Sequence, residues 1–295
     1  KYDLLHVDTI GLFQYVDLFP QTPIVLNHHN IESSMMFKRV QNESNRIKKF
    51  YFRKEFGKLK EYERFVCPKC AMNLVVSDMD AMRLKENVGS VNIAVVPNGV
   101  DVEYFQSRKD AGINHGGIIF AGTMDWYPNR AAVLYLLTEI LPKLRENGID
   151  MPVTIVGRNP FKELIAMAAR DSRISVPGFV DDVRPYIESA DIYICPIRDG
   201  GGTRLKILDA LAMEKSLVAT GLAVEGLDLV EGEHYLRAES ASDFVAQIKK
   251  LIIDRDLARG IALQGRRFVE KRFSWETIGG KMNCAYQEAV GKVVS

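Results

Sequence analysis

The sequence predicts an α/β protein of two domains, each built on a parallel sheet. The chain has 295 residues, 47% of them hydrophobic, and roughly 100–200 residues make one domain. Short apolar strands alternate with helical stretches, which is typical of parallel sheets covered by helices. Most of the strands after residue 117 end in glycine or proline, so a row of tight turns is expected at one edge of that sheet.

The first part of the chain shows two apolar runs, a long polar stretch and two further strands. The predicted elements are strands at 3–7, 22–27, 73–76 and 93–96, a helix between the first two strands, a helix or helical pair at 35–66 and a helix at about 78–88. The segment Pro97–Asp101 has turn chemistry, so it is the expected hinge between the domains.

The second part repeats the alternation more regularly. Strands are predicted at 118–121, 153–156, 174–176, 192–195 and 217–219, with helices at about 129–146, 161–170, 181–188, 203–213 and 241–253. Right-handed crossovers between parallel strands then produce a doubly wound, Rossmann-like domain. Its ligand is expected at the carboxyl ends of the strands, where the glycines fall.

Charge and hydropathy exclude several classes of protein. Lys and Arg number 39 against 38 Asp and Glu, so no nucleic-acid partner is expected from global charge. No uncharged apolar run approaches the roughly 18 residues of a membrane-spanning helix. The chain begins without a basic-then-apolar leader and without Met, so we expect a processed, truncated or subcloned piece.

The polar stretch at 35–66 is strongly basic, with ten Lys or Arg against four Glu and several interleaved Phe. Two interpretations fit this composition. The basic residues can form a solvated helix face, or residues 38–64 can make peripheral contact with an anionic membrane surface or acceptor.

The chain has four cysteines, two of them in Cys67-Pro68-Lys69-Cys70. A zinc ribbon needs a second pair, which the sequence lacks, and a redox pair normally opens a helix after a strand. The pair here follows a helical run instead. We therefore expect free thiols and a reducing, cytoplasmic location.

The glycine-rich segment Gly200–Gly202 follows a predicted buried strand and precedes a helix. Glycine lets the backbone approach a ligand closely, and a helix N-terminus favours anions. Thr203 is the expected N-cap, and Arg204 and Lys206 add two cations. These residues predict a phosphate-binding loop. Asp209 lies two turns into the helix, where it could reach a ribose hydroxyl group. The alternative is a flexible turn followed by two solvated cations.

This segment and several others, in order, resemble the retaining GT-B glycosyltransferases of family 4, also called glycosyl transferases group 1. The matching segments are Val75-Val76-Ser77 with Asp80, Val96–Asp101 with Phe105, Phe120–Trp126 with Pro128-Asn129, Val176–Val183, Pro196–Ala212, Val218–Thr220 with Val224–Leu227, and Phe273–Trp275. The resemblance covers nearly the whole chain. It implies two Rossmann-like domains facing a cleft, and a nucleotide diphosphate sugar as donor.

The resemblance also implies roles for single residues. Asp209 stands where the family has the second Glu of its E-x7-E motif, which holds the ribose. The first Glu position is Gly201, so that contact to the sugar is missing, and Asp199 is a candidate replacement. The family's Arg after the first strand of the donor domain is Thr123 here, so Arg204 and Lys206 are expected to bind the diphosphate.

The other implied contacts lie at strand ends. Gly178, Phe179 and Val180 are expected near the nucleobase, Arg158 in the same crevice, and Glu225 near the sugar. The full donor-binding prediction is Gly122, Thr123, Arg158, Gly178, Phe179, Val180, Gly201, Gly202, Thr203, Asp209 and Glu225. The alternatives are a plain turn at 178–180, a surface position for Arg158 and an exposed position for Glu225. Trp126 is expected either in the donor pocket or in the core.

In the first domain, His28 and His29 follow an apolar strand, where neighbouring side chains face opposite sides. The family's H-N-x-E pattern implies that His29 lies in the interdomain cleft near the acceptor; a structural His is the alternative. The predicted catalytic residues are therefore His29, Arg204 and Lys206. No metal or other cofactor is expected, because ligands at compatible spacing are lacking.

The sequence thus predicts a hexosyltransferase that transfers a sugar with retention to a glycan or lipid-linked acceptor. A nucleotide-sugar-binding module without turnover and a GT-B sugar-nucleotide epimerase are the alternatives. The predicted domains are 1–97, an incomplete acceptor-side domain; 98–275, the donor domain; and 276–295, a helix returning to the first. The protein is expected to be cytoplasmic, with or without peripheral membrane contact.

Overall fold

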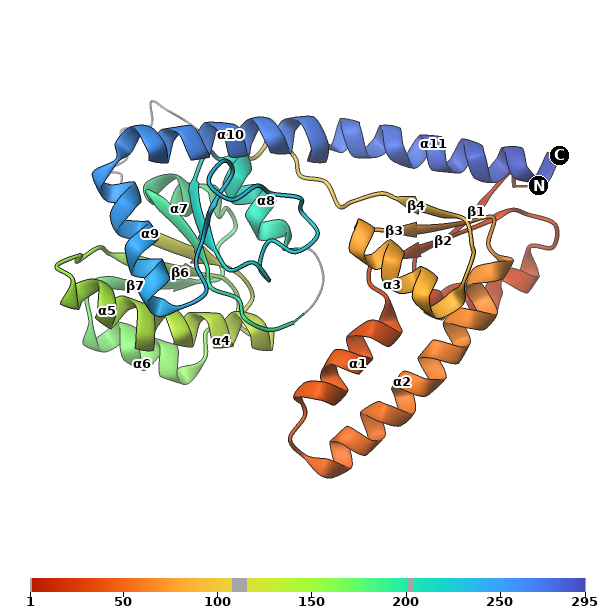
Figure 1. The fold of residues 1–295 in the computed structure, drawn as a ribbon, viewed down its shortest axis with the longest axis horizontal. Helices are drawn as coiled ribbons and strands as arrows, with labels where there is room; N and C mark the ends of the chain where they lie inside the picture. Colours follow the sequence, from red (N-terminus) through yellow and green to blue (C-terminus); the bar gives the residue numbers. More distant parts are fainter. Residues whose placement is uncertain (1, 108–115, 201–203, 295) are drawn as a thin grey trace. The chain divides into compact units, whose positions relative to one another are not determined.

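The structure is a computed structural model and describes residues 2–107, 116–200 and 204–294. Within these ranges the chain forms two compact units. Unit 1 holds residues 2–98 and 276–294, and unit 2 holds residues 99–200 and 204–275. Each unit contains its own sheet of parallel strands flanked by helices, which confirms the predicted α/β fold class (Figure 1).

Unit 1 is built on a four-stranded parallel sheet in the order β1-β2-β3-β4. Its strands are β1 (Leu5–Val7), β2 (Ile24–His28), β3 (Met72–Val75) and β4 (Ile93–Val95). Its helices are the 3-10 segments η1 (Ile10–Leu18) and η2 (Cys67–Lys69) and the α-helices α1 (Glu32–Asn42), α2 (Arg46–Val66), α3 (Asp78–Val88) and α11 (Trp275–Val294). The long basic stretch is therefore a helical pair.

Neighbouring residues of these strands point to opposite faces of the sheet, and each face has its own core. Leu26 and Val75 pack into a cluster with η1, the end of α2 and α3. Val25 and Leu74 pack on the other face against α11, which contributes residues such as Ala285. The last helix of the chain thus belongs to unit 1.

Unit 2 is built on a six-stranded parallel sheet in the order β10-β9-β8-β5-β6-β7. Its strands are β5 (Ile118–Ala121), β6 (Val153–Val156), β7 (Ile174–Gly178), β8 (Ile192–Cys195), β9 (Ser216–Ala219) and β10 (Leu236–Arg237). Its helices are α4 (Tyr127–Tyr135), the π-helical η3 (Leu136–Ile140), α5 (Leu141–Glu146), α6 (Lys162–Arg170), α7 (Arg184–Ser189), α8 (Leu205–Ala212), α9 (Ala241–Ile253) and α10 (Arg255–Phe273).

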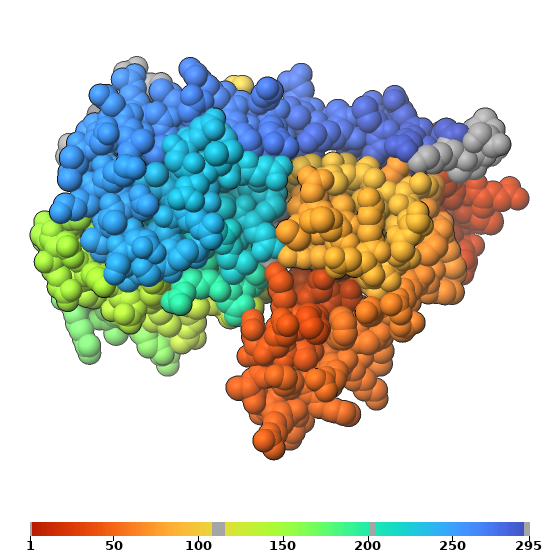
Figure 2. Space-filling model, in the orientation of Figure 1, coloured from red at the N-terminus to blue at the C-terminus, as the bar shows by residue number. Residues whose placement is uncertain are grey.

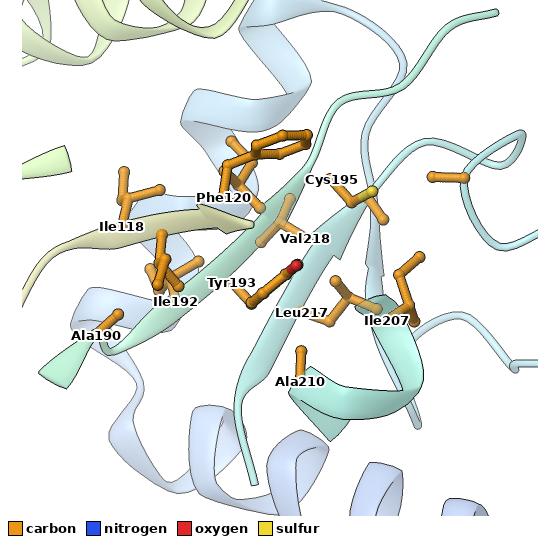
Figure 3. Packing of buried hydrophobic residues seen from close by; sticks show 14 of the residues in the cluster. Ile118, Phe120, Ala190, Ile192, Tyr193, Cys195, Ile207, Ala210, Leu217 and Val218 are labelled. Carbon is orange, nitrogen blue, oxygen red and sulfur yellow. The ribbon is translucent and has the colours of Figure 1, made fainter. Parts of the chain in front are cut away.

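The central strands of unit 2 are apolar on both faces because helices cover both. Figure 3 shows Phe120 of β5 and Tyr193 of β8 among the side chains of this core, with Ile207 and Ala210 of α8 beside them. Tyr193 is fully buried. The helix α8, which carries the predicted cations, is therefore anchored by its apolar residues to the centre of the sheet.

The elements β10 and α10 were not predicted, and each has a local cause. β10 has only two residues and shows no periodicity. The helix α10 was not predicted, since its Gly260 and Gly265 are poor helix formers. In the structure a Cβ at Gly265 would lie 2.7 Å from Leu211 Cδ2, so this glycine permits close packing of α10 against α8.

The predicted helix at 129–146 is continuous but contains the π-helical turn η3, directly before Pro142 near the start of α5. Proline lacks the amide N–H that would continue the regular ladder. No helix in the described part of the chain combines the length and apolarity needed to cross a bilayer.

Candidate functional site

The strand order of unit 2 changes direction between β5 and β8. From β5 the chain continues outward through β6 and β7, and from β8 it continues on the other side through β9 and β10. Doubly wound sheets bind ligands outside the carboxyl ends of the strands at such a switch point. The segments that follow these two strands begin at Gly122 and Pro196, so the candidate site lies there.

Three glycines lie side by side where β5, β6 and β7 end. The Gly122 amide donates to the Val156 carbonyl at 2.9 Å, and the Gly157 amide donates to the Gly178 carbonyl at 2.9 Å. A Cβ at Gly157 would collide with the Gly122 carbonyl group. The expected position of Gly122 and Gly178 at strand ends is confirmed, and their backbone groups share one edge of the sheet.

Lys206, in the first turn of α8, reaches across to the end of β5. Its Nζ donates to Asn129 Oδ1 at 2.6 Å and lies 4.5 Å from the centre of the Phe120 ring. A Cβ at Gly122 would overlap this ammonium group. Burial lowers the pKa of Lys206 to about 8. The fold therefore places a cation of reduced pKa against the Gly122–Thr123 backbone.

Asn129 completes this arrangement, although in the sequence it stands out only as part of a motif. Its Nδ2 donates to the Thr123 carbonyl at 2.8 Å while its Oδ1 accepts from Lys206. Asn129 is buried, so one amide ties the loop after β5 to the cation on α8. The spacing Trp126-x-Pro-Asn gave no signal of that contact, because Lys206 lies far away in the sequence.

Asp209 lies one turn after Lys206 on α8 and is half-buried. Burial raises its pKa to about 7, and the positive charge of Lys206 counteracts part of the rise. Burial also raises the pKa of Tyr193 in β8, with smaller contributions from Cys195 and Asp209, and the Tyr193 hydroxyl group is 3.5 Å from the Ala121 carbonyl. Lys206 and Asp209 thus form a partly desolvated pair of opposite charge.

Arg204 is only 7% exposed, so the alternative of a solvated cation is wrong for this residue. Its Nη2 donates to the Asp199 carbonyl at 3.4 Å. Burial lowers the pKa of Arg204, and the negative charges of Glu225 and Asp199 oppose that change. The structure therefore brings Glu225 close to Arg204, and Asp199 joins them from the loop after β8.

The start of α8 differs from the prediction. The helix begins at Leu205 with Arg204 as its N-cap, and the Arg204 side chain makes no capping hydrogen bond. The predicted start at 203 is therefore two residues early. Gly201, Gly202 and Thr203, predicted as part of the phosphate loop, lie outside the described residues.

Arg158 and Phe179 meet at the ends of β6 and β7. The Arg158 guanidinium carbon lies 4.7 Å from the centre of the Phe179 ring, and both side chains are exposed. The Met124 amide donates to the Arg158 carbonyl at 2.9 Å, which ties this loop to the one after β5. Val180, by contrast, packs partly against the core.

Trp126 is exposed and its ring lies tilted beside that of Tyr127 at the start of α4, with 5.4 Å between ring centres. The alternative of core packing is therefore wrong for Trp126. Its place, at the N-cap of α4, is in the loop after β5.

His29 belongs to unit 1, and its side chain points away from that of the preceding residue, His28. His28 is buried, and its Nε2 lies 3.1 Å from Asn73 Oδ1. His29 is exposed, and its Nε2 lies 3.1 Å from Asp8 Oδ1. The expected divergence of the two histidines is confirmed. Asp8, at the end of β1, is a neighbour that the sequence analysis missed.

Among the described residues, no group of three or more His, Cys, Asp or Glu side chains is placed to hold a metal ion. The thiols of Cys67 and Cys70 are buried and free, and burial raises the pKa of Cys70 to about 12.

Comparison with known proteins assigns both parts of the chain. Residues 1–104 match the model of Glycosyltransferase Family 4, and residues 115–254 match the model of Glycosyl transferases group 1. The chain belongs to the family 4 glycosyltransferases. The predicted family is confirmed, and the candidate site lies in the part matched by the group 1 model.

A curated relative of this family 4 chain is the phosphatidyl-myo-inositol mannosyltransferase of Mycobacterium tuberculosis. The two are 26% identical over 234 residues, which is 76% of this chain and 61% of the relative. The chain therefore spans less than two thirds of the length of that enzyme.

Solved structures confirm the GT-B fold. Sucrose-phosphate synthase from Thermosynechococcus elongatus superposes with a TM-score of 0.78 at 16% identity, covering 99% of this chain and 74% of that one. The Anabaena protein HepE in complex with UDP superposes with a TM-score of 0.75 at 16% identity, covering 97% and 79%.

Proposed function

We propose that this family 4 chain transfers a hexose from a nucleoside diphosphate sugar to an acceptor hydroxyl group, with retention of configuration. The observation that carries the proposal is the junction of Lys206, Asn129 and the Gly122–Thr123 backbone at the switch point of unit 2. The mannosyltransferase relative and the UDP complex of HepE support a nucleotide-sugar donor.

Lys206 and Arg204 are the proposed partners of the diphosphate. Breaking the bond between the anomeric carbon and the β-phosphate oxygen leaves negative charge on the diphosphate, and fixed cations stabilise that charge. Both cations are partly or largely desolvated, so they interact with an anion more strongly than surface cations do. The phosphate-loop residues Gly201, Gly202 and Thr203 stay part of the proposal.

The nucleoside is proposed to lie along the neighbouring strand ends. Gly178, Phe179 and Val180 offer backbone groups to the base, and the exposed Arg158–Phe179 pair offers a flat cationic surface beside it. Asp209 is the proposed acceptor for a ribose hydroxyl, and Glu225 the proposed contact to the sugar. Because base recognition through backbone groups leaves no side-chain signature, these contacts are compatible with more than one nucleotide.

On the acceptor side we assign His29, held by Asp8, to the reacting sugar and acceptor. No carboxylate is proposed as a nucleophile. The acceptor oxygen is proposed to attack the anomeric carbon from the face that the diphosphate leaves, and its proton passes to the departing phosphate oxygen. The transfer is proposed to need no metal ion.

The acceptor is proposed to be a glycan or a lipid-linked sugar, in a cytoplasmic pathway of glycolipid or polysaccharide synthesis. The curated relative is named for a phosphatidylinositol acceptor, which supports a lipid-linked class. Peripheral membrane contact through residues 38–64 belongs to the same proposal.

Thermal unfolding in the presence of UDP, GDP, ADP and NAD tests donor binding, and release of free sugar from UDP- and GDP-hexoses tests turnover. We expect UDP or GDP to raise the melting temperature and NAD to have no effect. Asp209→Asn and Lys206→Met should abolish sugar release, whereas Lys162→Ala, an exposed cation on α6, should not.

The outcomes separate the alternatives. Stabilisation by none of the nucleotides would overturn the donor site. Binding of UDP or GDP without sugar release or transfer, in this chain and in any longer chain that contains it, would leave a nucleotide-sugar-binding module. Interconversion of free nucleotide sugars would indicate an epimerase instead.

A further inference from the structure

The hairpin formed by α1 and α2 (residues 32–66) extends away from the sheet of unit 1. Figure 1 shows the two helices running outward from the strands, and in Figure 2 they project from the rest of unit 1. Between Glu32 and Val66 only Ser33, Val40, Glu63 and Val66 are buried. Most of the hairpin is therefore surface, although it is rich in aromatic residues.

Some of these aromatic residues hold the two helices together. The rings of Phe37 and Phe56 lie 5.2 Å apart, and the Arg39 guanidinium lies 5.0 Å from the centre of the Phe52 ring. Near the base of the hairpin the buried Glu63 accepts hydrogen bonds from the amide and hydroxyl groups of Ser33 at 2.9 and 2.5 Å. The inner face of α2 is thus accounted for by contacts with α1.

The first turns of α2 carry a second set of apolar side chains that point outward. Ile47 is 82% exposed, Phe50 72% and Tyr51 57%. Their spacing of three and four residues places them on one face of the helix. Isolated exposed apolar residues are common, whereas contiguous apolar patches mark interaction surfaces.

Cations surround this patch in the segment Arg46–Lys54. The segment contains five Lys or Arg and no acidic residue, namely Arg46, Lys48, Lys49, Arg53 and Lys54. Further along α2, Lys58 pairs with Glu55 at 2.8 Å and Arg64 pairs with Glu61 at 2.9 Å. Among the described residues no such ion pair is found for the five cations of 46–54, so their charge is available to an anionic partner.

We propose that the segment 46–54, the interfacial patch, binds an anionic lipid bilayer. Ile47, Phe50 and Tyr51 enter the boundary between headgroups and acyl chains, and the surrounding Lys and Arg contact the lipid phosphates. Helices with apolar and basic faces lie in membrane interfaces in this way. A polyanionic polymer offers the charge but no apolar phase for the three exposed side chains, so the bilayer is the better match.

This inference deepens the proposed membrane contact of residues 38–64 and is independent of the donor site in unit 2. Vesicle binding and nucleotide binding are therefore measured separately. A variant of the patch that loses vesicle binding should keep its thermal shift with UDP or GDP. Failure of the donor-site proposal would remove that shift and leave vesicle binding intact.

The test is co-sedimentation of the full chain with phosphatidylcholine vesicles, with and without phosphatidylglycerol. We expect binding to the anionic vesicles, weakened by added salt because the lipid charge is then screened. Two triple variants, Ile47→Ser/Phe50→Ser/Tyr51→Ser and Lys48→Gln/Lys49→Gln/Lys54→Gln, should each lower the vesicle partition coefficient at least about tenfold. Circular dichroism checks that both variants stay folded.

Leu18→Ser is the matched control. Leu18 is also in unit 1 and is 73% exposed, but no cation lies near it in the sequence; the control should bind vesicles as the parent chain does. Equal binding to neutral vesicles, or unchanged binding by either triple variant, would overturn the proposal. Binding to double-stranded DNA or dextran sulfate that needs the lysines and not the apolar residues would assign the patch to a polymer instead.

Discussion

At the residue scale, the candidate site depends on charges that the fold desolvates. Lys206 is turned toward the Gly122 backbone, and Asp209 lies one turn away on the same helix. Burial acts on the two groups in opposite directions, lowering the pKa of Lys206 to about 8 and raising that of Asp209 to about 7. An anionic ligand would favour the charged form of Lys206, so ligand binding and protonation are coupled.

Nucleotide affinity is therefore expected to depend on pH. Lys206 loses its charge as the pH rises through about 8, so the Kd for UDP or GDP should rise by about tenfold per pH unit above that value. Cys195, Arg204 and Asp209 are the other ionisable groups that face Lys206. Calorimetric titration between pH 6 and about 9.5 measures the dependence.

Lys206→Met removes the charge and keeps most of the length of the side chain. It should weaken nucleotide binding about tenfold to a hundredfold at neutral pH, the range of a charge-assisted hydrogen bond, and should flatten the pH dependence. Lys162→Met, on the exposed surface of α6, is the control. A steep pH dependence that persists in Lys206→Met would show that another group titrates.

Asn129 should matter for both stability and pH dependence. Asn129→Ala leaves the Thr123 carbonyl and Lys206 Nζ without this partner, so the free energy of unfolding should fall by about 1–3 kcal/mol. Asn129→Asp places a carboxylate beside Lys206, so it should raise the pKa of that ammonium group and move the loss of affinity to higher pH.

Urea unfolding and the same titrations measure these effects. Asn147→Ala is the control, since Asn147 is an exposed amide at the end of α5, and it should change stability by less than about 0.5 kcal/mol. An Asn129→Asp variant with an unshifted pH profile would argue that Asn129 does not set the environment of Lys206.

At the scale of the elements, the ends of β5 and β6 approach so closely that only a glycine fits between them. Gly157 has φ of 146° and abuts the Gly122 carbonyl group. That contact holds the loop after β5, which includes Thr123, against the loop after β6, which includes Arg158. Strand ends, rather than single side chains, thus set the spacing of the candidate site.

Gly157→Ala should destabilise unit 2 by about 2–4 kcal/mol, because the new methyl group adds a clash to an unfavourable backbone conformation. Gly148→Ala isolates the backbone term: Gly148 has φ of 74°, but nothing lies within 4 Å of a Cβ placed there. It should cost about 1–2 kcal/mol. Urea midpoints compare the two variants, and equal losses would rule out the close approach as the cause.

At the scale of the whole molecule, the last helix of the chain stabilises the first sheet. Ala285 of α11 is buried with Val25, Leu74 and Val96 of unit 1. Each unit has its own hydrophobic cluster, so the two are expected to unfold in separate thermal transitions. UDP or GDP should raise the transition temperature of unit 2 only. At a ligand concentration of 100 times Kd, the free energy of unfolding of unit 2 should increase by about 2.7 kcal/mol.

Ala285→Asp buries a charge in the core of unit 1. It should lower the free energy of unfolding of unit 1 by about 3 kcal/mol or more and leave the nucleotide-sensitive transition of unit 2 unchanged. Gln287→Asp, an exposed position on the same helix, should change neither. Differential scanning calorimetry resolves the transitions. If Ala285→Asp lowered only the temperature of the nucleotide-sensitive transition, the assignment of α11 to unit 1 would be wrong.

Much of this organisation was predictable because its cause is local. Alternating apolar strands and helices, and glycines at strand ends such as Gly122 and Gly178, depend on residues within a few positions of one another. The sequence by itself therefore determined the α/β class, most of the strands, the helical character of residues 35–66 and the family. It also pointed to Lys206 and to the carboxyl edge of the second sheet.

Only the tertiary structure decided which distant residues meet. The burial of Arg204 and the link from Asn129 to Lys206 each depend on segments far apart in the chain. Burial and pKa depend on everything packed around a group, and strand order is set by how crossovers close the sheet. Neither can be read from the local pattern, because neighbours in space are not neighbours in sequence.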